Sequence, residues 1–361
     1  MPELSFLDLI DVCDNVRVHQ PSPVPSQFDL ERLVPLYLSE STDSPVIGLL
    51  RPVIIDQLKL ENERSREIDQ ESLWALNLDE SNYVPRRNRA TGPSVSFHDW
   101  LDTHDKRTAA IKELCERWRD TLLFEDVCGP KKWRNELYPV YADPFGLHDH
   151  PTTAAPGEAL NFVFEMERSA CALLGVITYG VHMSIYEEFE ADGERALRVW
   201  VPTRSRTKQT FPGLLDNTVA GGIPSGMPIF ESMVKECMEE ASIADHIVRK
   251  YARTVGAISY FFRTSNGWLQ PEVEYVYDIL IPPDVDSTPF EPRPLDGEVE
   301  SFELLTLVEV IQKMRAGLFK PNCALVLIDL FIRLGYLTPE NEPDYMKIIT
   351  RLHGTFDLER W

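Results

Sequence analysis

The chain has 361 residues, of which 43% are hydrophobic and 26% are charged, an ordinary balance for a globular protein with enough length for two domains. Lysine and arginine number 36 against 58 aspartate and glutamate residues, and the formal net charge is −22. So acidic a surface repels a nucleic-acid backbone, and no block of basic residues offsets it. We therefore expect no nucleic-acid partner, and a negatively charged small substrate would need a metal ion to approach.

The cysteines and the apolar runs exclude several further classes of protein. None of the six cysteines forms a Cys-x-x-Cys pair, so we expect reduced, buried thiols and neither a zinc site nor a disulfide framework. The amino-terminal stretch MPELSFLDLIDVCDNV is acidic and lacks the basic region of a secretory signal or a mitochondrial presequence. The longest apolar run, ACALLGVITYGV, is too short to cross a bilayer. We expect a cytoplasmic protein with no membrane partner.

The amino-terminal part is rich in helix-compatible stretches separated by polar loops, and the clearest predicted helix covers residues 107–124. Its apolar residues recur at helical spacing, at Ile111, Leu114, Trp118 and Leu122. Residues 146–159, GLHDHPTTAAPGEA, have the composition of a boundary or a long loop. We therefore divide the chain into an accessory domain, residues 1–150, and a second domain, residues 151–361.

After this loop the sequence changes to β-branched and aromatic segments, which predict strands. The five segments cover residues 173–189, 196–204, 215–223, 255–262 and 273–282. A helical segment, 228–250, lies between the third and the fourth of them, and further helices are expected within 302–317 and 321–337, ended by Gly317 and Gly335. Strands in mixed order with a few helices predict an α/β sandwich.

Residues 228–241 predict a short amphipathic helix with Pro228 in its first turn. The apolar face consists of Phe230, Val234, Cys237 and Ala241. Three acids at i, i+3 and i+4 share a second face, expected almost opposite the first: Glu236, Glu239 and Glu240. Their repulsion would be offset by Mg²⁺ or Mn²⁺, which prefer carboxylate oxygen. The alternative is a solvated acidic face on an acidic protein.

This stretch, with the glycine-rich loop before it, resembles the Nudix box, G-x5-E-x7-R-E-U-x-E-E-x-G-U, where U is aliphatic. Gly221 matches the opening glycine, and Cys237 and Ile243 match the aliphatic positions. The three metal-binding acids of the box correspond to Glu236, Glu239 and Glu240. The resemblance therefore implies that metal binding is retained.

Three positions depart from the box. Met227 stands where the early glutamate belongs, Lys235 replaces the arginine, and Ser242 replaces the last glycine. In the family the early glutamate and the arginine brace one another, so the loss of the acid leaves less need for a guanidinium group.

The resemblance extends beyond the box, to FPGLLDNTVAGGIPSG, PEVEYVYDILIP and FKPNCALVLIDLFIRLGYL. These segments are similar to fungal and plant Nudix proteins related to thiamine diphosphate metabolism. Those proteins also carry an N-terminal domain of unknown function, whose end resembles WRNELYPVY at residues 133–141. The implied fold is a Nudix α/β/α sandwich with a mixed sheet and a smaller N-terminal α+β domain. The catalytic cysteine of the isopentenyl diphosphate isomerases is absent after Asn217, which argues against isomerase activity.

The activity implied by the resemblance is that of a pyrophosphohydrolase dependent on Mg²⁺, with Mn²⁺ as a substitute. Its substrate would be thiamine diphosphate or an oxidised, damaged derivative, cleaved to the monophosphate and phosphate. Two alternatives stay open: hydrolysis of nucleoside diphosphate derivatives, and a binding module of the same fold with little turnover. The expected partner is a small-molecule diphosphate, and a homodimer also stays open.

The resemblance also suggests roles for individual residues. Catalytic roles fall to Glu239 and Glu240, and Glu298 is a further candidate acid whose alternative is an ordinary loop residue. Gly221, Gly222 and Gly226 would let the backbone approach the diphosphate. Arg204 and Lys208 are the nearest cations in the sequence, and each would contact the terminal phosphate or serve only as surface charge.

Overall fold

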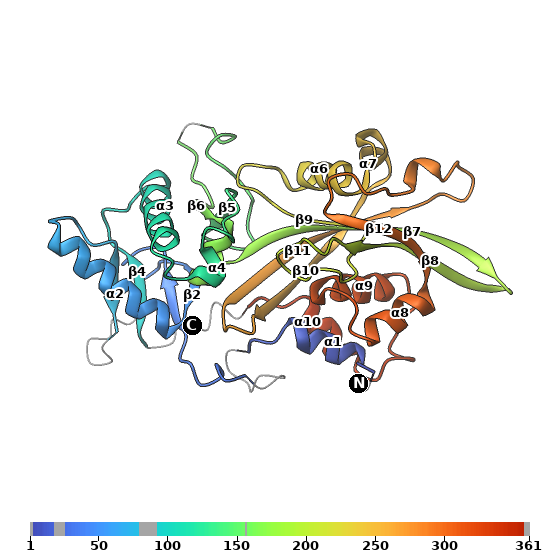
Figure 1. Cartoon of the computed structure of the whole chain (residues 1–361), viewed down its shortest axis with the longest axis horizontal. Helices are drawn as coiled ribbons and strands as arrows, with labels where there is room; N and C mark the ends of the chain where they lie inside the picture. The colour runs from blue at the N-terminus through green and yellow to red at the C-terminus, as the bar shows by residue number, and fades with distance from the viewer. Residues whose placement is uncertain (1–2, 18–25, 79–91, 156, 357–361) are drawn as a thin grey trace.

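The structure is a computed structural model that describes residues 3–17, 26–78, 92–155 and 157–356. Two units lie side by side along the long axis of the molecule (Figure 1). The first is built around a four-stranded sheet, and the second around a larger six-stranded sheet.

The first unit has a sheet in the order β2-β1-β4-β3, with β1 and β4 parallel and the other pairs antiparallel. Its strands are β1 (Val34–Tyr37), β2 (Val46–Leu50), β3 (Trp74–Asn77) and β4 (Ser94–Phe97). Its helices are α2 (Pro52–Glu67), α3 (His104–Asp120) and α4 (Glu125–Cys128). A separate antiparallel pair joins β5 (Leu137–Tyr141) to β6 (Phe162–Glu167). These elements confirm an α+β unit.

Helix α3 matches most of the helix predicted over 107–124 but ends earlier. Thr103 caps its start by accepting a hydrogen bond from the Lys106 N–H group at 3.3 Å. The expected residues Ile111, Leu114 and Trp118 are buried, as predicted. Leu122 is exposed, so its assignment to the buried face was wrong. The helix has ended at Asp120, and Leu122 adopts a φ of 58° outside it.

The second unit has a mixed sheet in the order β10-β11-β7-β8-β12, with the short β9 beside β7. Among the described strands of this sheet, only β11 and β7 pair in parallel. The strands are β7 (Thr178–Ala191), β8 (Glu194–Arg204), β9 (Val219–Gly222), β10 (Arg253–Arg263), β11 (Leu269–Leu280) and β12 (Val299–Thr306). Each of the five segments predicted as strands contributes one of them.

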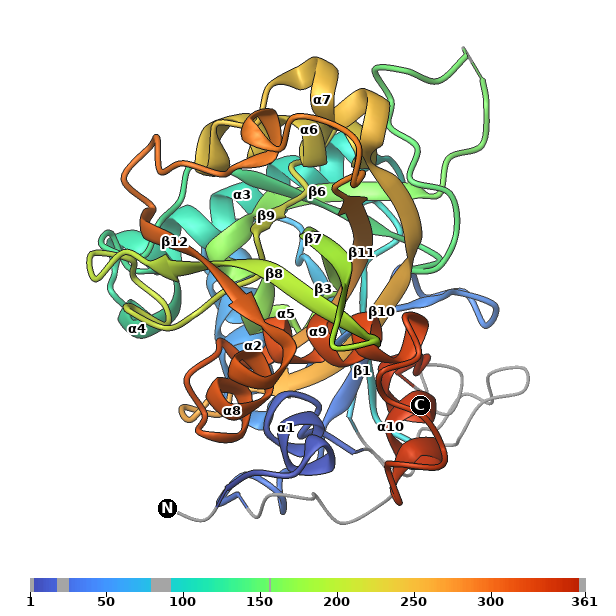
Figure 2. The same ribbon diagram turned by 90° about the vertical axis from the view of Figure 1, so that its right-hand side faces the viewer.

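Helices cover both faces of this sheet, which makes the unit an α/β/α sandwich, as expected (Figure 2). One face carries α6 (Ile229–Ala241) and α7 (Asp245–Tyr251). The other carries α1 (Phe6–Cys13), α8 (Leu307–Arg315), α9 (Pro321–Arg333) and α10 (Tyr345–Leu352). The predicted stops lie just beyond α8 and α9, where Gly317 and Gly335 adopt positive φ values of 70° and 77°.

The six cysteines are free and buried, as predicted. In the part of the chain that the structure describes, no helix is both long and apolar enough to cross a membrane.

Residues on both sides of position 150 contribute to the first unit. The division of the chain at residue 150 therefore stays a prediction. Strand β6 pairs with β5 across this position, and the core of the first unit extends to Val176. Three short helices complete the fold: α5 (Cys171–Leu174) and the 3₁₀ turns Arg168–Ala170 and Thr288–Phe290. Helix α1, although amino-terminal, packs against α9 and α10 of the second unit.

The turn between β10 and β11 inserts Trp268 into the core of the first unit. The indole lies edge-on to Phe124, with ring centroids 5.5 Å apart, and its Nε1–H donates to Asp126 at 2.7 Å. The guanidinium of Arg51 lies 4.9 Å from the ring. One aromatic side chain of the second unit is therefore part of the packing of the first.

We predict that Trp268→Ala lowers the free energy of unfolding by about 3–5 kcal/mol, because it leaves a cavity where the units meet. Calorimetric unfolding should also change from one transition to two, since the units lose a shared core residue. Val308→Ala, at an exposed position on α8, serves as the control. An unchanged single transition in Trp268→Ala would contradict the coupling.

Candidate active site

Helix α6 carries the three predicted glutamates and is fixed by its apolar side. Val234, Cys237 and Ala241 are buried, as predicted, and Phe230 is half-buried. Pro228 is the residue before the helix, at the N-cap, rather than part of the first turn. The amphipathic pattern thus predicts the helix and the face that it buries.

The helix ends at a residue with a positive φ. Ser242 has a φ of 57°, in the left-handed region that glycine adopts most easily. Its hydroxyl donates to the carbonyl of Arg293 at 2.9 Å, and the backbone N–H of Ser242 bonds to the carbonyl of Cys237. The serine therefore retains the helix ending expected of the box glycine that it replaces.

The three glutamates do not form one solvated face. The side chains of Glu240 and Glu236 are only 8% and 14% exposed, whereas Glu239 is 51% exposed. The prediction that the acids lie almost opposite the core is wrong for Glu236 and Glu240. The reason is that α6 packs against the short strand β9 along this flank of the helix.

The close approach of the helix to β9 depends on a residue without a side chain. A Cβ atom at Gly221 would lie 2.3 Å from the Cδ carbon of Glu236, far inside van der Waals contact. The next turn is held by a hydrogen bond from the Ala220 N–H group to Oε2 of Glu240 at 3.1 Å. Glu236 and Glu240 are therefore packed against the backbone of Gly221 and Ala220.

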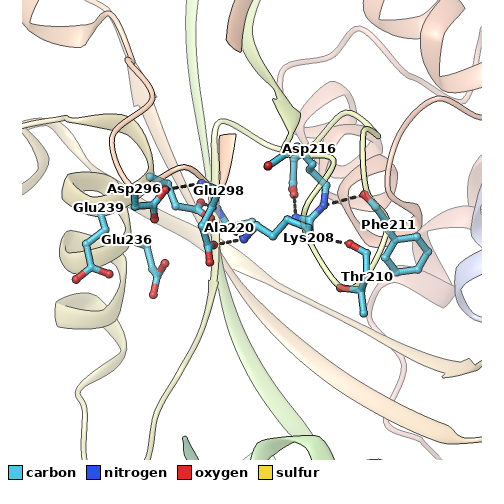
Figure 3. A network of polar contacts seen from close by, with 12 residues as sticks. Lys208, Thr210, Phe211, Asp216, Ala220, Glu236, Glu239, Asp296 and Glu298 are labelled. Carbon is cyan, nitrogen blue, oxygen red and sulfur yellow. Dashed lines mark hydrogen bonds and ion pairs between the residues drawn. The ribbon is translucent and has the colours of Figure 1, made fainter. Parts of the chain in front are cut away.

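Two lysines lie among these carboxylates. Lys208 bonds to the carboxylate of Glu298 and lies 3.7 Å from Oε1 of Glu240 (Figure 3). Lys235 lies 3.3 Å from Glu236 and 3.1 Å from Glu239. Lys208 and Glu298, which are far apart in the sequence, thus reach the acids of α6, and Lys235 bridges two of those acids rather than pairing with a residue at position 227.

The glutamate oxygens are more widely spaced than the ligands of a bound ion. Among the described residues, the set whose ligand atoms all lie within 4.8 Å of one another is His182, Asp216 and Cys323. That set is internally bonded, since Cys323 Sγ lies 2.6 Å from Asp216, which also pairs with Arg204 at 2.5 Å. A cation there would compete with the guanidinium, so we interpret this set as a buried polar network. The glutamates as a ligand set stay a prediction.

Arg204 does not lie free at the site. Its Nη1 pairs with Asp216, and its Nε and Nη2 donate to the carbonyls of Phe211 and Thr210, both at 3.1 Å. The side chain is buried. Its guanidinium therefore holds the loop that carries Lys208, and these bonds leave it unavailable for the phosphate contact that the sequence suggested.

The loop after β9 rests on the first unit. The Ser225 N–H group donates to the carbonyl of Leu137 at 2.8 Å, and Gly226, with a φ of 78°, lies against the His150 ring. A Cβ atom at Gly222 would lie 1.5 Å from the hydroxyl oxygen of Tyr138. The first unit thus contacts the loop in which Met227 replaces the bracing glutamate.

Two residues of the first unit lie at the end of β9, and the sequence did not reveal them as part of the site. Tyr138 and Arg168 lie beside Gly222, more than fifty positions away along the chain. The only available signal was the likeness of residues 133–141 to the end of an accessory domain, and it gave no side chain a role.

The carboxylates of the site differ in their protonation. Burial raises the pKa of Glu240 to about 8, and the negative charges of Asp216 and Glu236 add to this, against Lys208. Burial also raises the pKa of Glu236. For Glu298 the effect of burial is outweighed by the hydrogen bond and the charge of Lys208, so its pKa is lowered. Near neutral pH, Glu298 is ionised while Glu240 tends to keep its proton.

We predict that metal-free protein loses stability as the pH rises from about 5 to about 8, because Glu240 binds its proton more tightly in the folded state than in the unfolded one. Glu240→Gln cannot lose this proton and should gain on the wild type over this range, by an amount on the order of a few kcal/mol. Urea unfolding in the presence of EDTA at several pH values measures the difference. Parallel stability curves for the two proteins would contradict the raised pKa.

We also predict that Gly221→Ala displaces Glu236 and weakens Mn²⁺ binding by about tenfold or more, since the added methyl group overlaps the carboxylate. Titration calorimetry with Mn²⁺ measures this. Gly354→Ala is the control, because a Cβ atom there meets nothing closer than 3.8 Å. Equal Mn²⁺ affinity in Gly221→Ala and the wild type would show that the close approach is irrelevant to the ion.

Comparison with known proteins finds relatives along most of the chain. Residues 80–178 match the model of a family described as a domain of unknown function, DUF4743. The chain is 33% identical to the uncharacterized protein YJR142W of Saccharomyces cerevisiae, over 97% of this chain and 90% of the yeast protein. It is 36% and 34% identical to Nudix hydrolase 20 and Nudix hydrolase 24 of Arabidopsis thaliana, both named chloroplastic.

The two plant alignments cover 72% and 73% of this chain, and the chain spans 61% and 64% of the plant proteins. The yeast alignment includes nearly the whole chain, so both units occur together in that relative. The structure has a mixed sheet between two layers of helices, with acids on α6 that contact a glycine of β9. These are the fold and the motif that the resemblance to Nudix proteins implied, and the plant relatives carry that family's name. Over nearly three quarters of its length, this chain is therefore similar to plant proteins named Nudix hydrolases.

Proposed function

We propose that the protein is a Mg²⁺-dependent hydrolase that cleaves the diphosphate bond of thiamine diphosphate, or of an oxidised derivative, to the monophosphate and phosphate. The observation that carries this proposal is the burial of Glu236 and Glu240 against the bare backbone of β9. Such carboxylates are costly without a counter-charge, which a bound cation would supply.

The residues proposed to hold Mg²⁺ are Glu236, Glu239 and Glu240. They fit a hard cation, because all are carboxylates and two are buried beside one another's charge. Glu239 is exposed and has room to turn toward the other two. When bound, the ion would neutralise the phosphate and lower the pKa of a water molecule.

The chain supplies both a base and a cation near these acids. Glu298 is ionised through its contact with Lys208, so it can accept a proton from an attacking water. Glu239 and Glu240 keep the catalytic roles that the resemblance implies. Lys208, between Glu298 and Glu240, is placed to contact a phosphate oxygen. The backbone at Gly221 and Gly222 carries no side chain, and Glu236 and Tyr138 lie against it.

The choice of thiamine compounds rests on the likeness of the strand and loop segments to thiamine-related Nudix proteins. Two other outcomes remain in the test: hydrolysis of nucleoside diphosphate derivatives, and binding without turnover. The second would follow if Met227 left the loop too loose for catalysis. The contacts of Ser225 and Gly222 with the first unit favour an ordered loop and therefore turnover. The cytoplasmic location and the homodimer stay predictions.

We predict that the protein with Mg²⁺ releases phosphate from thiamine diphosphate or its oxidised analogues, and that Glu240→Gln lowers kcat by about a hundredfold or more. The panel should also contain ADP-ribose and nucleotide sugars, with phosphate measured before and after alkaline phosphatase treatment. Glu303→Gln, on an exposed position of β12, is the matched control and should retain wild-type turnover.

The outcomes distinguish three hypotheses: a hydrolase of thiamine compounds, a hydrolase of nucleoside diphosphate derivatives, and a binding module. Turnover confined to thiamine compounds supports the proposal, and efficient cleavage of nucleotide sugars replaces it with the second reading. Saturable binding of thiamine diphosphate without phosphate release supports the binding module. Full activity in Glu240→Gln would contradict the role of the helix in any of them.

A further inference from the structure

The two consecutive glycines of β9 have different neighbours. A Cβ atom at Gly221 would lie 2.3 Å from the carboxylate carbon of Glu236, on the side of α6. At Gly222 it would lie against Tyr138 and 3.4 Å from the guanidinium carbon of Arg168, both from the first unit. Because successive residues of a strand point to opposite faces, the backbone here separates an acidic neighbour from a cationic one.

Arg168 is held in place but is only partly neutralised. Its Nη1 donates to Glu136 at 2.7 Å, and its guanidinium carbon lies 4.9 Å from the centre of the Tyr138 ring. The side chain is 42% exposed. Within the described part of the chain, Nε and Nη2 make no hydrogen bond, so one edge of the planar fork is available to a ligand.

A second arginine lies in the same electrostatic neighbourhood. Burial lowers the pKa of Arg134, and the positive charge of Arg168 lowers it further, while the charge of Glu298 opposes the shift. No ion pair joins the Arg134 side chain to another described residue. The Arg134 N–H group donates to the Glu167 carboxylate at 2.8 Å, and the Arg168 N–H group donates to the Glu136 carbonyl at 2.8 Å, so the segments that carry the two arginines lie side by side.

The loop that carries Lys208 reaches the same place. Gln209 donates to the carbonyl of Lys131 at 2.9 Å, which ties this loop to the segment that contains Arg134. Lys208 thus lies beside Glu240 on one side of β9, and Arg168 lies beside Gly222 on the other.

We propose that Arg168, assisted by Arg134, binds the phosphate end of the diphosphate substrate, so that the first unit completes the active site of the second. This inference rests on the proposed function for the identity of the ligand as a diphosphate. A guanidinium fork matches the geometry of phosphate oxygens and adds charge-assisted hydrogen bonds. It takes the role that Arg204 cannot fill, since Asp216 and two carbonyls occupy that side chain.

The test measures binding rather than turnover. Titration calorimetry with methylenediphosphonate, which cannot be hydrolysed at its P–C–P bridge, is carried out with saturating Mg²⁺. We expect Arg168→Ala to weaken its binding by about tenfold or more and Arg134→Ala by a smaller factor, because one or more charged hydrogen bonds are lost. Binding of Mg²⁺ alone should stay within about twofold of wild type in both variants.

Arg195→Ala is the matched control. Arg195 also pairs with a glutamate, Glu188 at 2.5 Å, and lies over a tyrosine ring, Tyr336, but it sits on β8 away from the acids. It should bind the probe like the wild type. Thermal unfolding of every variant checks the fold, and Arg168→Lys keeps the charge without the fork. If Arg168→Ala does not fold, weaker binding in folded Arg168→Lys supports the proposal, and wild-type binding overturns it.

The remaining outcomes distinguish this inference from the proposed function. A wild-type protein that binds the probe but hydrolyses no compound would overturn the hydrolase and leave the role of Arg168 standing if Arg168→Ala loses the probe. Wild-type affinity in folded Arg168→Ala overturns the inference while phosphate release by the wild type still supports the hydrolase. Failure of the wild type to bind the probe with Mg²⁺ overturns the inference as well.

Discussion

The packing of two glutamates against the backbone of the short strand β9 is the constraint on which the rest of the site depends. Glu236 and Glu240 lie so close to Gly221 and Ala220 that any larger residue at Gly221 would displace a carboxylate. Burial at this point makes ionisation of the acids unfavourable and therefore favours a cation among them. The space that side chains would take at Gly221 and Gly222 is occupied by Glu236 and Tyr138. The requirement for a counter-charge thus arises from a single contact between α6 and β9.

The first unit contacts the loop after β9 directly. It supplies a backbone carbonyl to the loop at Ser225, a ring beside Gly226 and a hydroxyl against Gly222. In the opposite direction, Trp268 of the second unit fills part of the first unit's core. These contacts fix the loop from outside, which offers a physical account of how the chain tolerates Met227 in place of an internal brace. An accessory unit held this firmly can also present side chains to a substrate.

Positively charged side chains lie near the site although the protein as a whole is strongly negative. The protein as a whole repels anions, yet Lys208 lies 3.7 Å from Glu240, and Arg168 lies beside the neighbouring residue Gly222. Lys208 keeps Glu298 ionised while Glu240 retains its proton, so neighbouring acids differ in readiness to accept one. This separation is what a site needs if one carboxylate is to bind an ion and another is to take a proton from water.

The sequence by itself determined the helix of residues 229–241, its buried face, the positions of five strands along the chain and the glycines of the loop. These follow from periodicity, β-propensity and local motif, which act over a few residues. Only the tertiary structure decided that Glu236 and Glu240 are buried, that Arg204 is taken by Asp216, and that Tyr138 and Arg168 reach Gly222. Burial and ion pairing depend on which elements meet after folding. Residues more than fifty positions apart meet only when β5, β6 and β9 come together, and no local pattern records that encounter.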